Sequence, residues 1–596
     1  MSFKSASENN LFQFSFFKDF VLIQNIQKEK DVILEINSFG AVKILDAMDN
    51  VPKSIKIIRG YGIFGLIKLI SGYYIIVITE RIREGFVDNK IIYRVAKTEI
   101  YKIGFSDLLT PRQSSCEKGF LENIKLCLNI KNYYFSYNYD LTNSLQSQRH
   151  SDLNYFSWEN ANSEFFFNSY LCHPLILASN ELPRIENFIL PVINGYFMTK
   201  KILIKNTELT VTLITRRSKN NQGARFFCRG VDKDGNVANY AETEQILEFY
   251  SFGNQESEKF GLRQNEKCSV SLSLLQIRGS APFKWAQVIC GKYKPKLIVD
   301  SFNADGFIKH TKKILHNYNK VAVINLVDKK KYEMPIAIEF QRLVDTNNLE
   351  NLTYFHYDFH SESKKNKLYK KDDLLEQTLQ DILSNFGCYR KINYETPRII
   401  ELQQGIARTN CMDCLDRTNV IQSKLAFMWI QNELRHYGLI LPSETFSDFS
   451  EAEYILRNLW ADNADFLSLA YSGTPALKTD ITRTGIRTLK GAFSDGLNSA
   501  LRYFIGCYYD GFRQDSIDIF FGKYRVPILY TSDYDFKTTL IKRVTNTIYP
   551  YSLAYILNWP TLAPYLYSIH VTNPMSELEL PTPYSINMKK PLGKIK

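Results

Sequence analysis

The residues best suited to chemistry lie in one short segment, residues 408–419, with the sequence RTNCMDCLDRTN. Five residues separate Cys411 from Arg417, and Thr418 follows directly. A cysteine thiolate is a strong nucleophile, and a guanidinium binds two phosphate oxygens in a fork. The spacing therefore predicts attack of sulfur on a phosphate ester, with Cys411 as nucleophile and Arg417 as phosphate clamp. By itself the spacing is weak evidence, because chance supplies it readily.

Patterns on either side of this segment predict how it is held. Residues 398–402 form a short apolar run typical of a strand, and residues 420–437 repeat apolar side chains at helical spacing. Thr418 and Asn419 are favoured residue types for the start of such a helix. A loop between strand and helix directs backbone N–H groups and the positive end of the helix dipole at one point. We therefore expect a phosphate-binding loop that also lowers the pKa of Cys411.

Two acidic residues within the loop call for an explanation. The carboxylates of Asp413 and Asp416 repel a bound phosphate unless they are protonated or turned away. We interpret them as candidates for proton transfer, with a raised pKa when the site is occupied. Thr418 is placed to donate its hydroxyl to sulfur, which makes the sulfur a better leaving group from a phosphocysteine.

Cys411 and Cys414 also form a C-x-x-C pair, which has other interpretations. One is half of a zinc site, but such a site usually needs a second close pair, and the sequence has no other C-x-x-C. Another is a redox dithiol, in which Cys414 protects Cys411 through a reversible disulfide. The arginine and the two acids in the same loop favour phosphate chemistry over both.

A histidine pair elsewhere raises the question of a metal site. His356 and His360 are four residues apart, but residues 352–357 have the pattern of a strand. On a strand, residues four apart are separated by about 13 Å, which is too far for one ion. We therefore expect neither a metal nor another cofactor.

Residues 408–419 resemble the signature of the Sac-domain phosphoinositide phosphatases, R-x-N-C-x-D-C-L-D-R-T-N. Further blocks similar to this family occur in order from about residue 60 to 525. These blocks are residues 64–66, 77–79, 139–142, 216–218, 225, 229–232, 239–245, 276–285, 460–463, 476–485 and 510–515. Within the family, the similarity is greatest to the member of the endoplasmic reticulum and Golgi.

The resemblance implies a fold with α/β and β-rich parts. A β-rich N-terminal Sac domain, residues 1–180, is expected to pack on an α/β catalytic domain of the cysteine-phosphatase type, residues 181–525. The pattern of short β-branched and aromatic runs in the first 180 residues favours strands, and residues 370–387 have helical spacing. A C-terminal tail, residues 526–596, follows.

The resemblance also implies a substrate class and residue roles. The substrate is a phosphoinositide monophosphate in a membrane, with the 4-phosphate lipid foremost and the 3-phosphate lipid also accepted. Cys411 is the nucleophile and Arg417 the phosphate clamp, while the family's acid has been argued for the positions of Asp413 and Asp416. The other loop residues predicted to contact substrate are Asn410, Met412, Cys414 and Leu415.

Basic residues downstream of the loop are candidates for reading the lipid headgroup. Lys478 and Arg483 lie in one segment that also contains Asp480. A second phosphate or the inositol hydroxyls need such groups, and we predict substrate contact for both bases. The alternative for Arg483 is a structural ion pair with Asp480, three residues earlier.

Composition limits the choice of partners and compartment. The chain has 596 residues, 74 Lys and Arg against 62 Asp and Glu, and a net charge of +12. The basic residues are dispersed and form no stripe, which argues against nucleic acid and suits an anionic membrane surface. The 10 cysteines are also dispersed, and no N-terminal signal peptide is recognisable, so we expect a reduced, cytosol-facing protein.

The tail contains a long uncharged segment. Residues 544–576 hold no Asp, Glu, Lys or Arg. Prolines 550, 560 and 564 interrupt the segment, whereas a membrane span needs about 20 mostly apolar residues. We expect the tail to associate with the membrane, with a true span as the alternative. The expected location is the cytosolic face of the endoplasmic reticulum and Golgi membranes.

Two other functions remain as alternatives to lipid hydrolysis. A protein phosphotyrosine phosphatase shares the sulfur chemistry, but the long N-terminal domain and the two acids in the loop disfavour it. A non-catalytic phosphoinositide-binding scaffold is the other, and a decayed enzyme is expected to lose Cys411 or Arg417, both of which are present. The sequence points to no particular protein partner.

Overall fold

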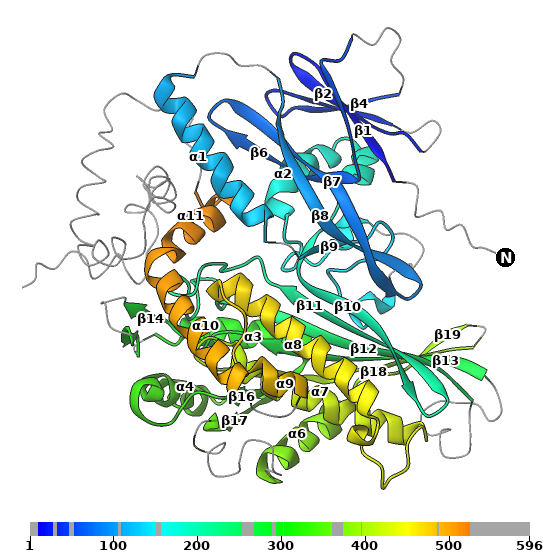
Figure 1. Cartoon of the computed structure of the whole chain (residues 1–596), viewed down its shortest axis with the longest axis vertical. Helices are drawn as coiled ribbons and strands as arrows, with labels where there is room; N and C mark the ends of the chain where they lie inside the picture. The colour runs from blue at the N-terminus through cyan, green and yellow to red at the C-terminus, as the bar shows by residue number, and fades with distance from the viewer. Residues whose placement is uncertain are drawn as a thin grey trace, which may run out of the picture. The chain divides into compact units, whose positions relative to one another are not determined.

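The structure is a computed structural model that describes residues 10–524, except for 28–31, 47–52, 105–108, 131, 151–156, 253–266, 289–293, 302, 360, 362–372, 395 and 485–487. The chain forms two compact units (Figure 1). In the described part, the first contains residues 10–143, 157–194 and 508–524, and the second contains residues 144–150 and 195–507. The compact units thus divide at residue 194, after the expected boundary at 180. The predicted tail, residues 526–596, lies outside the described residues.

The first unit is rich in antiparallel strands. One sheet of five strands has the order β4-β3-β2-β1-β5. Its strands are β1 (Phe12–Phe16), β2 (Phe20–Asn25), β3 (Ile33–Asn37), β4 (Val42–Leu45) and β5 (Lys56–Gly60). Side chains of β1 and β3 alternate between buried and partly exposed positions, as expected for strands with one face on a core.

A second run of strands in this unit pairs in chain order. Its members are β6 (Gly62–Leu69), β7 (Gly72–Val87), β8 (Lys90–Lys102) and β9 (Tyr133–Phe135). The helices of the unit are α1 (Pro111–Leu128), α2 (Ser169–Ser179) and α11 (Asp510–Phe520). Our expectation of mostly strands omitted α1 and α2. The sequence did carry a signal for α1, since Thr110 and Gln113 form a capping box at its start.

The second unit contains a mixed sheet with the order β17-β16-β20-β13-β12-β11-β10. Its strands are β10 (Ile193–Ile204), β11 (Thr207–Arg217), β12 (Ala241–Phe252), β13 (Lys267–Arg278), β16 (Lys320–Asn325), β17 (Leu352–His356), β18 (Tyr389–Asn393), β19 (Pro397–Glu401) and β20 (Gly405–Asn410). A separate ribbon pairs β14 (Trp285–Val288) with β15 (Lys296–Val299). The β-rich first unit and mixed α/β second unit agree with the expected fold class at this level.

From α3 to α7 the helices of the second unit alternate with its strands along the chain, as expected of an α/β unit (Figure 1). They are α3 (Asp305–Tyr318), α4 (Met334–Asn347), α6 (Asp373–Phe386), α7 (Asp416–His436), α8 (Ser450–Ser472), α9 (Thr479–Thr484) and α10 (Leu489–Tyr508). A single apolar core joins residues of the sheet with residues of α6, α7 and α8. The helices predicted at residues 370–387 and 420–437 correspond to α6 and α7.

The strand that leads into the loop is β20, which corrects our expectation of residues 398–402. The latter residues belong largely to β19, which pairs with β18. β20 lies between the parallel strands β16 and β13 and is wholly buried. We missed it because Arg408, Thr409 and Asn410 break the apolar pattern of a central strand.

Helix α7 also begins earlier than expected, at Asp416. Leu415 occupies the N-cap position and makes no side-chain cap, so Thr418 and Asn419 lie inside the first turn. The loop therefore consists of residues 411–415, between the carboxyl end of β20 and the start of α7. Among the described residues, no helix combines the length and the apolar character that crossing a membrane requires.

Candidate active site

The sulfur of Cys411 accepts hydrogen bonds from two groups of its own loop and helix. The Cys414 N–H donates to Sγ at 3.1 Å, and the Thr418 hydroxyl donates at 3.5 Å. Burial alone favours the neutral thiol. Hydrogen bonding from Cys414, the charge of Arg417 and the Thr418 hydroxyl outweigh burial and lower the pKa of Cys411 to about 6. The group is therefore mainly a thiolate at neutral pH, as the loop geometry predicts.

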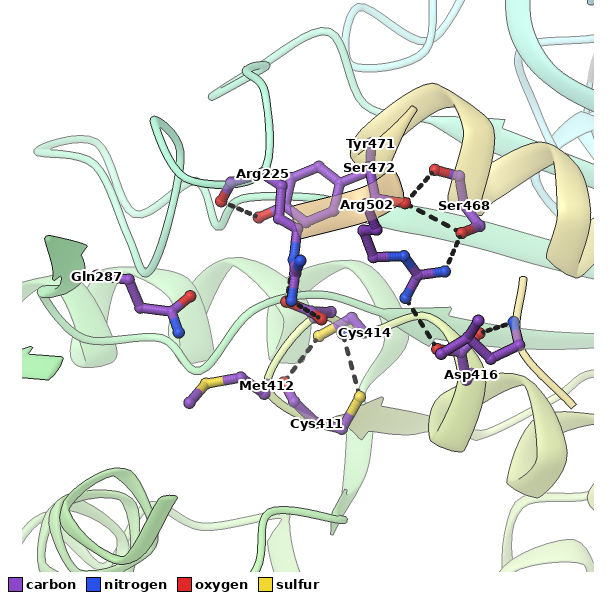
Figure 2. A network of polar contacts seen from close by, with 12 residues as sticks. Arg225, Gln287, Cys411, Met412, Cys414, Asp416, Ser468, Tyr471, Ser472 and Arg502 are labelled. Atoms are coloured by element: carbon purple, nitrogen blue, oxygen red, sulfur yellow. Dashed lines mark hydrogen bonds and ion pairs between the residues drawn. The ribbon is translucent and has the colours of Figure 1, made fainter. Parts of the chain in front are cut away.

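Cys414 supports Cys411 and is itself a poor nucleophile. Its φ of 53° lies in the left-handed region, and its N–H donates to the sulfur of Cys411. Its own thiol donates to the Cys411 carbonyl at 3.3 Å (Figure 2). Burial and the neighbouring Cys411 raise the pKa of Cys414 well above its ordinary value, so it stays protonated. The redox interpretation of this pair stays a hypothesis.

The first of the two histidines considered and rejected as a metal pair has a partner within the protein. His356 ends β17 and donates from Nε2 to the carbonyl of Val327 at 2.8 Å. The second histidine, His360, lies outside the described residues. Within the described part of the chain, no group of three or more His, Cys, Asp or Glu is arranged to hold a metal ion.

The guanidinium of Arg417 is bound to a carboxylate. Its Nη1 and Nη2 each donate to one oxygen of Glu333 at 2.8 Å. Nη1 also donates to the Leu326 carbonyl at 2.9 Å and to Asp328 at 3.3 Å. These partners belong to the segment that links β16 to α4, at the same sheet edge as the loop. Glu333 thus occupies the fork that we assigned to phosphate, and sequence reasoning did not find it.

Asp413 is ionised and anchored by two arginines. Arg225 donates from Nε at 3.0 Å and from Nη2 at 2.8 Å, and Arg229 donates from Nη2 at 2.6 Å. Burial raises the pKa of Asp413, but the charges of Arg225 and Arg229 more than compensate and hold it well below its usual range. This direction is opposite to the raised pKa that we expected for a proton donor with phosphate bound. The physical reason is the pair of cations, which the loop sequence does not contain.

Arg229 and Asn239 extend the anchor to the backbone of the loop. Arg229 is buried and donates from Nη1 to the Met412 carbonyl at 3.2 Å. The Asn239 side-chain amide donates to the Asp413 carbonyl at 3.1 Å. Arg229 also donates to Gln287 at 2.6 Å and to the Tyr471 hydroxyl at 3.1 Å, which fixes its position. The family resemblance includes Arg225 and Arg229, but their role was not apparent from sequence.

Asp416 connects the start of α7 to the segment before α9 and to α10. One carboxylate oxygen accepts the Leu477 N–H at 2.6 Å, and the other accepts Nη1 of Arg502 at 3.1 Å (Figure 2). Arg502 is buried and also donates to Thr474 and Ser468, both at 2.9 Å. Two acids of the loop are thus held by arginines from different elements.

Three of the predicted substrate-contacting residues have side chains that are buried in the protein. The Asn410 side chain donates to Asn325 at 2.7 Å and accepts from Arg408 at 3.3 Å, so it bridges β20 and β16. Leu415 is buried in the core, and Met412 is also buried. These three side chains are therefore not free to bind substrate. The predicted contact remains for the backbone N–H groups of Met412 and Leu415.

Arg483 is an ion-paired residue, which was the alternative to substrate contact. Its guanidinium donates to Asn458 and Asp462, both at 2.7 Å, and to Asp465 at 3.1 Å. Both acids lie on α8, so the ion pair forms with α8 and not with Asp480, the partner that the alternative named. Asp480 instead accepts hydrogen bonds from Thr488. The charge of Arg483 is already balanced by α8, and a role in substrate binding has no support from its contacts.

Lys478 remains a candidate for the lipid headgroup. It adjoins Leu477, whose N–H binds Asp416, and its own N–H donates to Asp495 at 3.0 Å. Its φ of 60° gives the backbone a sharp turn beside the loop. The ammonium lies 5.7 Å from the centre of the Phe359 ring. The structure thus brings Lys478, unlike Arg483, next to an acid of the catalytic loop.

Two buried arginines beside the loop make no hydrogen bond to an acidic side chain within the part of the chain that the structure describes. Arg278 donates from Nη2 to Gln422 and to Asn419, while its Nε and Nη1 have no hydrogen-bond partner among the described residues. Burial lowers the pKa of Arg278 to about 10, and the charges of Cys414 and Cys411 act in the opposite direction. Arg408 donates to backbone carbonyls and to Nε2 of His310. Both cations favour negative charge on the loop.

Comparison with known proteins places this fold and site in one family. Residues 61–364 match the SacI homology domain, and the chain belongs to the Sac domain family. It is 39% identical over 499 residues to phosphatidylinositol-3-phosphatase SAC1 of Saccharomyces cerevisiae, with 83% of this chain and 77% of the relative aligned. The recognition made from the loop and its accompanying blocks is therefore confirmed.

Relatives from an animal and a plant extend the match. Phosphatidylinositol-3-phosphatase SAC1-B of Danio rerio is 33% identical over 553 residues, covering 88% of this chain and 90% of the relative. Phosphoinositide phosphatase SAC7 of Arabidopsis thaliana is 32% identical over 523 residues, covering 86% and 83%. The similarity therefore includes most of both chains.

Proposed function

We propose that the chain is a phosphoinositide phosphatase, a phosphoric monoester hydrolase that works through a phosphocysteine. The observation that carries the proposal is the thiolate of Cys411 at the start of α7, with its pKa lowered to about 6. Membership of the Sac domain family and relatives named as phosphoinositide phosphatases support the substrate class. The mechanism uses no metal or cofactor.

In the first step, Cys411 Sγ attacks phosphorus and the bond from phosphorus to the ester oxygen breaks. The backbone N–H groups at the start of α7 and the guanidinium of Arg417 receive the negative phosphate oxygens. Arg417 must exchange the carboxylate of Glu333 for phosphate, since both present two oxygens to the same fork. The inositol oxygen leaves with a proton.

We assign the donor of that proton to Asp416. Asp413 is held as a carboxylate by Arg225 and Arg229, which suits an anchor better than an acid. Asp416 has one arginine partner and directly precedes Arg417. In the second step, Asp416 accepts a proton from water as the water oxygen bonds to phosphorus. The bond between sulfur and phosphorus breaks, and Thr418 and the Cys414 N–H stabilise the departing thiolate.

The preferred substrate in this proposal is phosphatidylinositol 4-phosphate, with the 3-phosphate lipid also hydrolysed. The family resemblance supports the 4-phosphate lipid, and the naming of the SAC1 relatives as phosphatidylinositol-3-phosphatases supports the 3-phosphate lipid. We place the reaction at the cytosolic face of the endoplasmic reticulum and Golgi membranes. The uncharged segment in the C-terminal tail supports association with a membrane.

Phosphate release from vesicles tests the proposal. Purified protein should release phosphate from vesicles that contain phosphatidylinositol 4-phosphate, and Cys411→Ser should release none while still binding them. Equal release by the variant would exclude the sulfur mechanism. Vesicle binding without release by the wild-type protein would favour the scaffold alternative. A panel of the three monophosphates then ranks the ring positions.

A further inference from the structure

Helix α10 presents a continuous apolar stripe to solvent. Leu489, Phe493, Leu497 and Leu501 are 92%, 72%, 58% and 48% exposed. They recur at every fourth residue, so they lie along one side of the helix. Single exposed apolar side chains are ordinary, but a contiguous row on one element marks an interaction surface. We call these four residues the α10 stripe.

The opposite side of α10 faces the protein. Arg502 and Gly506 are buried, and a methyl group in place of hydrogen at Gly506 would lie 2.4 Å from the Phe226 ring. The helix thus packs by one face and leaves its other apolar face outward. A helix that only completes the core has its polar residues on the outward face. In α10 the outward face carries the four apolar residues of the stripe instead.

α10 is tied directly to the catalytic loop. Arg502 donates to Asp416, and Asp495 accepts the N–H of Lys478 beside that loop. An α-helix is about 10–12 Å wide, so the outward face of α10 lies about one helix width from the groups that touch the loop. Figure 2 shows Arg502 directed from α10 toward Asp416.

Lys490 is exposed in the first turn of α10, and the carboxylate of the neighbouring Asp480 accepts hydrogen bonds from Thr488. The nearby Asp495 is engaged with a backbone N–H. An apolar stripe with an exposed lysine at its first turn fits the interface of an anionic bilayer, where each buried methylene and each nearby lysine adds affinity.

We propose that α10 is an interfacial helix, which inserts the α10 stripe into an anionic bilayer beside the catalytic loop. The inference rests on the proposed function, because a lipid headgroup reaches Cys411 only if the bilayer surface comes to the loop. It goes beyond that function by assigning membrane contact to the catalytic unit itself. The C-terminal tail then supplies retention, while α10 sets the orientation of the loop.

The test compares one variant on two substrates, with the full chain throughout. Phe493→Ser combined with Leu497→Ser removes the middle of the stripe without touching a buried group. The first substrate is phosphatidylinositol 4-phosphate in vesicles of phosphatidylcholine and phosphatidylserine. The second is a short-chain, water-soluble form of the same lipid. We expect kcat/KM on vesicles to fall about 10-fold and turnover of the soluble lipid to stay unchanged.

A matched control uses exposed apolar residues of the same unit that lie on other elements. Leu203 and Leu441 are 62% and 57% exposed, and Leu203→Ser with Leu441→Ser should leave both rates at the wild-type level. If the stripe variant hydrolyses vesicle lipid as well as the wild type, the inference is wrong. Equal loss on both substrates assigns α10 a structural role and also overturns it. A wild-type dimer that the stripe variant converts to monomer overturns it in favour of a second copy.

A failure of the proposed phosphatase function gives a different experimental result from a failure of the α10 inference. A wild-type protein that hydrolyses neither substrate contradicts the phosphatase proposal. In that case vesicle binding decides the inference alone. Weaker binding by the stripe variant than by the control variant supports the interfacial helix, and equal binding refutes it.

Discussion

Arg417 and Glu333 form a two-pronged ion pair, with both nitrogen–oxygen distances at 2.8 Å. The pair is largely buried, since the side chains are 13% and 14% exposed. A carboxylate and a phosphate offer the same pair of oxygens to a guanidinium. Glu333 is therefore a competitor for the group that is to bind substrate, and it keeps a buried cation satisfied until phosphate arrives.

Replacing Glu333 with glutamine should strengthen the binding of inorganic phosphate. The substitution removes the competing charge, so we expect the inhibition constant of phosphate to fall about 3- to 10-fold. Thermal unfolding of the free protein should occur at a lower temperature, because Arg417 loses its counter-charge. Glu451→Gln, at an exposed position in the first turn of α8, is the control. Weaker phosphate inhibition in Glu333→Gln would mean that Glu333 positions Arg417 for substrate.

The pH dependence of Cys411 is a second prediction. Its folded pKa of about 6 lies below that of an ordinary thiol, near 8.5. The thiolate therefore stabilises the fold above the ordinary pKa, and this contribution disappears as pH falls through about 6. Alkylation by iodoacetamide should rise with pH and reach half of its maximum near pH 6.

Variants of Thr418 show how much its hydroxyl, as opposed to the helix, lowers the pKa of Cys411. Thr418→Ala should shift the alkylation midpoint upward by about 1 unit, since a hydrogen bond to a charged group is lost. Thr418→Ser keeps the hydroxyl and should retain the wild-type midpoint. An unshifted midpoint in the alanine variant would leave the helix and Arg417 as the main causes of the lowered pKa.

The loop and its helix could be predicted because their information is local. Cys411, Arg417 and Thr418 lie within eight residues of one another, and α6 and α7 show apolar residues at helical spacing. β20 could not, because a central strand that ends in buried polar residues has no apolar pattern. Its polar side chains are satisfied only across the sheet, as Asn410 is by Asn325.

The partners of the loop could not be predicted for a related reason. Arg225 is 188 residues from Asp413 in sequence, Glu333 is 84 residues from Arg417, and Arg502 is 86 residues from Asp416. No periodicity relates positions so far apart. The sequence therefore shows two acids in this segment but not the arginines that bind them, Arg225 for Asp413 and Arg502 for Asp416.

Arg278 provides a fourth prediction, because it is buried and no acidic side chain among the described residues hydrogen-bonds to it. We infer that it stabilises the thiolate of Cys411 from behind the loop. Arg278→Met removes the cation without leaving a carboxylate unpaired, so the fold should persist. The alkylation midpoint of Cys411 should rise by about 1 unit, and Arg278→Lys should restore part of the difference. A folded methionine variant with the wild-type midpoint would refute this role.

Substituting Asp413 and substituting Asp416 should reduce turnover in different ways when the leaving group of the substrate is changed. The inositol oxygen is a poor leaving group and needs a proton, whereas the oxygen of an aryl phosphate departs as a stable phenolate. Asp416→Asn should therefore lower turnover of the lipid about 100- to 10,000-fold and largely spare an aryl phosphate. The comparison uses kcat for each substrate at the same pH.

Asp413→Asn should lower both activities to a similar extent, because the anchor of the loop fails whatever the leaving group. Arg225 and Arg229 would then be buried beside a neutral amide, at a cost of about 3–5 kcal/mol for a broken buried pair. The midpoint of Cys411 alkylation reports the loop directly and should change in Asp413→Asn but not in Asp416→Asn. The reverse pattern, with the aryl phosphate spared only by Asp413→Asn, would make Asp413 the acid and Asp416 the anchor through Arg502.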